Sequence, residues 1–174
     1  FMMSMGPQRE LLSSMPDACR VWVFAAQRWL TTEESASLRS EMTAFVSGWQ
    51  AHGKDLLAGF DLLFDCVLVV SVDETKEPPS GCSIDKVFHL LKMQNEKWQL
   101  DFFQRTLIWA WVGNELCIYD YPSLLKALKE GEVKMNTPVL NTLPATLGDF
   151  RNKRFMSLSD SWVAKKLHRD LQNT

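Results

Sequence analysis

The chain has 174 residues, of which 46% are hydrophobic and 23% are charged, and its formal net charge at pH 7 is −2. That length can bury a sizeable core, and the composition is typical of a globular protein and not of a disordered chain. The charge balance gives no basic surface for nucleic acid, and neither an apolar run of about 18 residues nor a polybasic run indicates a membrane. We therefore expect neither nucleic acid nor a membrane among its partners.

The cysteines and the start of the chain bear on location and domain organisation. No two cysteines have the C-x-x-C spacing of a metal or redox pair, and two lie in apolar runs, where a free thiol behaves as a small hydrophobe. With no secretory pattern before them, we predict reduced thiols and a cytoplasmic location. Residues 1–18 are predicted to be a flexible lead-in, and residues 19–174 a single α+β domain. The cysteines are Cys19, Cys66, Cys82 and Cys117.

The first predicted elements are a strand and a helix. Residues 20–28 are short, apolar and aromatic, which indicates a buried strand. Thr31, followed three residues later by Glu34, has the spacing of a capping box and predicts a helix start. The helix is expected to end near residues 51–54, where a glycine interrupts the pattern. Its apolar face contains Leu38, Met42, Phe45, Val46 and Trp49.

Two strand-like runs follow, over residues 58–64 and 66–73, and predict a hairpin that turns at Phe64-Asp65. A single long bent strand is the alternative. The run V-L-V-V-S-V is apolar on both faces, which is typical of a central strand. Two adjacent prolines then predict a loop over residues 75–81, before a second helix over residues 83–98. The buried face expected for that helix contains Ile84, Val87, Phe88, Leu91 and Trp98.

The remainder of the chain predicts a further hairpin and helices. Two apolar runs flank Gly113-Asn114, which is a two-residue hairpin signal. The expected elements are strands over 107–112 and 115–119, a helix over 122–130, a strand over 137–142, a loop over 143–154 and a last helix whose apolar face contains Trp162, Val163, Leu167 and Leu171.

The order of the first six elements is strand, helix, strand, strand, helix, strand, as in the split βαβ sheet of ferredoxin-like domains (βαββαβ). We predict this α+β fold with a C-terminal hairpin and helix extension, and another α+β arrangement is the alternative. The topology puts the first and third strands in the middle of the sheet, and those are the most continuously apolar runs. It also brings His52, Asp73, Glu74 and residues 80–85 to one edge of the sheet.

Cys82 is the candidate nucleophile at that edge. It lies at or just before a helix N-terminus, where the partial positive charge and the free N–H groups favour a thiolate. His52 would serve as its base and Asp73 would orient that base, as in a nucleophilic triad. The alternative is that Cys82 only fills the loop, because no local signature of a known cysteine hydrolase surrounds it.

The same segment is a candidate site for a small polar or anionic ligand. Two hydroxyls and a flexible glycine before a helix form the donor array that phosphate or carboxylate requires, although an ordinary capped helix is the alternative. No G-x-x-x-x-G-K-[ST] motif occurs, so the segment is not a P-loop. No H-x-x-x-H or E-x-x-H spacing organises the nearby acids, so we expect no metal and no cofactor. The candidate ligand-binding residues are Ser80, Gly81, Ser83, Asp85 and Glu74.

The segments V-W-V-F, H-G, V-D-E and S-G-C-S-I-D resemble, in the same order, segments of a family of short, uncharacterised bacterial cytoplasmic proteins. The resemblance covers about residues 21–162, and residues 80–85 are its most specific part. Some members carry the label "ABC transporter ATPase", which this sequence does not support because it has neither a Walker A motif nor a signature motif. The resemblance implies no activity and no catalytic residues.

Three functional alternatives follow from these patterns. The preferred one is a small soluble binding module that holds a small polar or anionic ligand at the N-terminus of the helix starting near Ser83. The second is an enzyme that uses Cys82, with His52 as its base. The third is a protein-interaction or self-association domain, whose sheet edge or Trp-rich hairpin meets a partner or a second copy in a homodimer.

Overall fold

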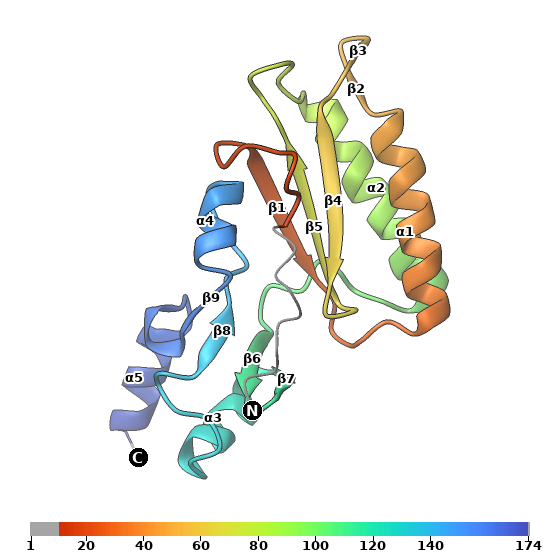
Figure 1. Ribbon diagram of the computed structural model, residues 1–174. Coiled ribbons are helices and arrows are strands. Elements are labelled where there is room, and N and C mark those ends of the chain that lie inside the picture. The colour runs from red at the N-terminus through yellow and green to blue at the C-terminus, as the bar shows by residue number, and fades with distance from the viewer. Residues whose placement is uncertain (1–10, 174) are drawn as a thin grey trace. The chain divides into compact units, whose positions relative to one another are not determined.

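The computed structural model of the protein describes residues 11–173, which form two compact units (Figure 1). The N-terminal unit contains residues 11–104 and 142–152, and the C-terminal unit contains residues 105–141 and 153–173. Antiparallel sheets and helices occur in both, which confirms the α+β class. The single domain predicted from residue 19 onward is thus built of two units. No helix within the described residues is long and apolar enough to cross a bilayer.

The N-terminal unit contains a three-stranded antiparallel sheet with two long helices on one of its faces (Figure 1). Its main elements are β1 (Arg20–Ala25), α1 (Thr32–Ser47), β4 (Ala58–Leu63), β5 (Val67–Val72) and α2 (Gly81–Trp98). The strand order is β1-β5-β4, and every residue of β5 is buried, which confirms the predicted central strand. The chain turns from β4 into β5 at Phe64 and Asp65, whose φ angles are 53° and 51°, which confirms the predicted hairpin.

Side-chain caps determine where the two helices begin. The Thr31 hydroxyl accepts a hydrogen bond from the backbone N–H of Glu34, and the Glu34 carboxylate accepts one from the backbone N–H of Thr31, which confirms the capping box. Ser80 and Ser83 form the same reciprocal pair at α2, so that helix begins at Gly81 and not at Ser83. A cap satisfies N–H groups that have no partner within the helix, and therefore sets its first turn.

An ion pair ties the ends of three elements together. Arg28 follows β1 and donates to the two carboxylate oxygens of Glu34 at 2.9 and 3.1 Å, and to the backbone oxygen of Trp98 at 2.6 Å. Glu34 lies in the first turn of α1, and Trp98 is the last residue of α2. The hydrogen bond from Arg28 is the main reason that the pKa of the Glu34 carboxyl is lowered. The two helices are thereby held across one end of the sheet.

Part of the predicted lead-in over residues 1–18 is packed. Leu11 and Met15 are 2% and 5% exposed. The guanidinium of Arg151, in α4 (Leu147–Asn152), donates to the backbone oxygen of Leu11 at 2.8 Å. The region predicted as a loop over 143–154 therefore contains a helix, and that helix holds residues 11–15 in place. The sequence gives no local signal for this contact because the two segments are far apart in the chain. Residues 1–10 lie outside the described residues.

A short hairpin that the sequence does not indicate follows α1. It consists of β2 (Gln50–Ala51) and β3 (Lys54–Asp55), with His52 and Gly53 at the turn. Both turn residues have left-handed backbone conformations, with φ of 52° and 76°, as the tightest hairpin turns require. Strands of two residues carry no periodicity, so this region was predicted only as the end of a helix.

The C-terminal unit is built on a four-stranded antiparallel sheet. Its elements are β6 (Ile108–Val112), β7 (Glu115–Tyr119), α3 (Tyr121–Lys129), β8 (Pro138–Leu140), β9 (Phe155–Ser157), the 3-10 helix η1 (Leu158–Asp160) and α5 (Ala164–Gln172). The strand order is β7-β6-β8-β9, and the pairing of β6 with β7 confirms the hairpin predicted at Gly113-Asn114. Leu124 of α3 and Leu167 of α5 are fully buried in the same cluster as Ile108 and Val139 of the sheet.

The four-stranded ferredoxin-like sheet is not confirmed, because the predicted fourth strand lies in the other unit. The first three strands do take the order of the split βαβ arrangement, β1-β5-β4. The fourth, β6, pairs with β7 and β8. The reason is local: a two-residue turn gives β6 a partner next to it in sequence, at a low cost in loop-closure entropy. As a result β1, predicted to lie inside a sheet, is an edge strand among the described residues.

Candidate functional site

The elements that carry the predicted site residues meet at one end of the N-terminal unit. The indole N–H of Trp49 donates to the backbone oxygen of Ser83 at 2.9 Å, and the Ser83 hydroxyl donates to the backbone oxygen of Gln50 at 3.0 Å. Lys54 of β3 and Glu77 of the loop after β5 form an ion pair at 3.7 Å. The β2–β3 hairpin, the loop after β5 and the start of α2 are therefore neighbours, as the topology predicted.

The hydroxyls predicted to hold a ligand are engaged within the protein. The Ser80 hydroxyl accepts from the backbone N–H of Ser83 at 3.1 Å, and the two hydroxyls lie 2.7 Å apart. Ser83 is 1% exposed and also bonds the β2–β3 hairpin. Gly81 and Asp85 are exposed on the same turn. The serines thus begin the helix and attach it to the hairpin, so the hydroxyls are not aimed at an incoming ligand.

The three residues of the predicted triad lie at this end, and no hydrogen bond or ion pair among the described residues joins any two of them. Asp73 is 5% exposed, and its carboxylate accepts from the hydroxyl and backbone N–H of Thr75 at 2.6 and 3.0 Å. The hydrogen bonds from Thr75 are the main reason that the pKa of the Asp73 carboxyl is lowered. His52 is exposed at the hairpin turn, and Cys82 is exposed in the first turn of α2. Asp73 therefore orders its own loop and does not orient His52.

The remaining predictions for this region concern Glu74 and a metal site. Glu74 forms an ion pair with Arg20 at 3.5 Å, and both side chains are nearly half exposed. Within residues 11–173, no group of three or more His, Cys, Asp or Glu side chains could hold a metal ion. The polar end of the unit therefore contains surface ion pairs and caps.

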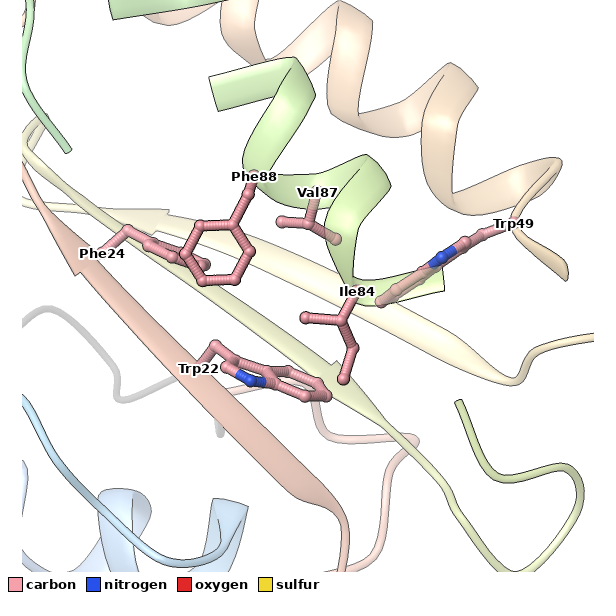
Figure 2. A pocket seen from close by; sticks show the side chains of 6 residues that line it. All are labelled: Trp22, Phe24, Trp49, Ile84, Val87 and Phe88. Atoms are coloured by element: carbon pink, nitrogen blue, oxygen red, sulfur yellow. The ribbon is translucent and has the colours of Figure 1, made fainter. Parts of the chain in front are cut away.

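A hollow lined only by apolar side chains lies beside this polar end (Figure 2). Trp22 and Phe24 of β1 form one wall, and Ile84 and Phe88 of α2 form the other. Phe88 is 36% exposed and contacts Phe24 edge to face, with 5.4 Å between ring centroids. The space amounts to about 160 Å³, counting the part that is open to solvent. The lining is completed by Trp49 and Val87.

The backbone of β1 borders this hollow with an open edge. The backbone N–H of Ala26 donates to Cys66, which continues the ladder toward β5, whereas the backbone oxygen of Cys19 accepts from Leu147 on the other side. Backbone groups alternate in direction along a strand, so those of Val21 and Val23 point away from β5. On that side Thr146 forms an antiparallel bridge with Arg20, which brings Ala145 opposite Val21, so the edge is open among the described residues only from Val23 onward.

Sequence reasoning missed this hollow although two signals were present. Trp22 and Phe24 alternate along the strand, so both must lie on the same face of the sheet. Ile84 and Phe88 extend the apolar stripe of α2 beyond the Val87 and Leu91 positions that face the core. Sequence reasoning instead placed these residues in a buried strand and on the buried face of a helix.

No family model, curated protein or solved structure matches the chain. The resemblance to uncharacterised bacterial proteins therefore stays a prediction, and functional inference depends on the geometry of these two regions.

Proposed function

We propose that the protein is an interaction module that binds an extended segment of another polypeptide along β1. The observation that carries this proposal is the coincidence of an open backbone edge at Val23 with an apolar hollow on the same strand. Main-chain hydrogen bonds to a sheet edge supply affinity in strand addition, and pockets for alternate side chains supply specificity. The proposal selects the third of the functional alternatives.

The size of the hollow favours a protein partner over a small molecule. Pockets for drug-sized ligands enclose about 300–1,000 Å³, whereas this hollow encloses no space that could hold even a water molecule. An uncharged aromatic surface of this kind suits apolar side chains that lie on it, as aromatic residues do in protein interfaces. The lining side chains carry no charge and the surface that they expose to the hollow is apolar, which also disfavours a polar or anionic ligand there.

The composition of β1 supports the same conclusion. Natural edge strands avoid pairing by carrying lysine, proline or a bulge. Between Arg20 and Ala25 the strand V-W-V-F has none of these, and its register against β5 is continuous. The first three strands of the ferredoxin-like arrangement are present. A fourth strand would lie beside β1 in that arrangement, and we propose that the partner segment binds there.

The test is selection of peptides from a displayed random library, followed by affinity measurement on three forms of the full chain. We expect selected peptides to carry apolar residues at alternate positions and to lose binding to Phe88→Asp, which charges the wall of the hollow. Met93→Asp is the matched control, because Met93 is 56% exposed on another side of α2. Selected peptides that bind Phe88→Asp as tightly as the parent protein would contradict the proposal.

A further inference from the structure

We infer that a single water molecule is bound where α1 and α2 meet. It accepts a hydrogen bond from the indole N–H of Trp98 and donates one to the side-chain oxygen of Gln94. This inference does not depend on the proposed function, and it assigns an internal binding site to the helical layer of the N-terminal unit.

Gln94 presents a buried acceptor that lacks a partner. The residue is 3% exposed, and its side-chain NH2 donates to the carboxylate of Glu41 in α1. A carboxylate only accepts hydrogen bonds, so Glu41 fixes the orientation of the amide and turns its oxygen the other way. That oxygen is buried and has no hydrogen-bond partner among the described residues. An unpaired buried acceptor is costly, because folding removes its hydrogen bonds to water.

Trp98 presents the complementary donor one helical turn away. Its indole N–H is also buried and lacks a partner within residues 11–173. Residues four apart on a helix are neighbours on the same face, so this donor and the Gln94 oxygen lie along one stripe of α2. The two atoms do not bond each other. A third group that serves both of them removes both penalties at once.

The chemistry of these two atoms selects the ligand. The Gln94 oxygen requires a donor, and the Trp98 N–H requires an acceptor. A cation such as ammonium would satisfy only the oxygen, and an anion such as chloride would satisfy only the N–H. A hydroxyl group serves both, and water is the smallest molecule that carries one. Buried waters in proteins commonly bridge polar groups that lack a protein partner.

The site adjoins the bridge that Arg28 forms at the same end of α2. Arg28 donates to the backbone oxygen of Trp98 and to the carboxylate of Glu34, so it joins the last residue of α2 to the first turn of α1. The bond from Gln94 to Glu41 joins the same two helices. A water between Gln94 and Trp98 connects these two contacts into one polar network, which fixes the side-chain rotamers there.

Nuclear magnetic resonance of the full chain labelled with 15N tests the inference. The indole signal of Trp98 is identified by its loss in Trp98→Phe. We expect a cross-peak between water and the Trp98 indole proton that has opposite signs in the NOE and the rotating-frame (ROE) spectra, which distinguishes a bound water from proton exchange. Gln94→Leu, which removes the acceptor, should abolish this cross-peak. Met93→Leu is the matched control on the same helix, and it should keep the cross-peak because Met93 is 56% exposed.

Two results would overturn the inference. The first is a Trp98 indole proton without a cross-peak to water, which would mean that the N–H stays unpaired or bonds Gln94 directly. The second is a cross-peak that survives in folded Gln94→Leu, because the water would then not be held by Gln94. If Gln94→Leu does not fold, the spectrum of the parent protein decides by the presence or absence of the cross-peak.

Discussion

Replacing Arg28 by glutamine should destabilise the protein by about 2–3 kcal/mol at neutral pH. The substitution removes two hydrogen bonds to Glu34 and one to the backbone oxygen of Trp98. The Glu34 side chain is 9% exposed, so its carboxylate would be left nearly buried without its cation. Breaking a buried ion pair costs about 3–5 kcal/mol, and we place the value lower because the Arg28 side chain is 37% exposed.

The pH dependence of this effect has a definite sign. The folded protein lowers the pKa of the Glu34 carboxyl from its ordinary value of 4.5. The stabilisation is therefore present above that ordinary value and is lost as the pH falls through the lowered pKa. The difference in free energy of unfolding between the parent protein and Arg28→Gln should be largest at pH 7 and should shrink toward pH 3.

Urea unfolding followed by tryptophan fluorescence at a series of pH values measures both quantities. Lys126→Gln is the control, because Lys126 and Glu130 form an exposed pair on α3 whose loss should cost less than about 0.5 kcal/mol. A free energy of unfolding for Arg28→Gln within about 0.5 kcal/mol of the parent at pH 7 would refute the reasoning. A deficit that does not change with pH would show that Glu34 is not its cause.

Two further predictions concern the core and the thiols. Val69→Asp buries a carboxylate in the middle of β5, where Val69 is 0% exposed, and should cost several kcal/mol; a thermal melt within a few degrees of the parent would contradict the packing described for β5. Brief alkylation at pH 8, read by peptide mapping, should modify exposed Cys82 first and buried Cys66 last, because burial raises the pKa of the Cys66 thiol to about 12. Equal rates for these two thiols in folded protein would be inconsistent with that burial.

The sequence by itself determined the elements whose signals are local. The Thr31 and Glu34 capping box, the turn at Phe64-Asp65 and the Gly113-Asn114 hairpin each depend on residues a few positions apart. The central position of β5 was also predictable, because a strand that is apolar on both faces must be buried on both. The convergence of the β2–β3 hairpin with the start of α2 followed from the order of these elements.

Tertiary structure decided which strands become neighbours and which hydrogen-bond partner each polar side chain takes. Pairing between strands that are distant in sequence has no local signal. The predicted elements therefore did not show that β6 pairs with β7 and β8 and not with β1. Phe88, which sequence reasoning placed on the buried face of a helix, is 36% exposed. In the same way Asp73 was expected to orient His52, yet Thr75, two residues away, takes its carboxylate. The physical reason is that a side chain near several partners bonds the one whose geometry the folded backbone provides.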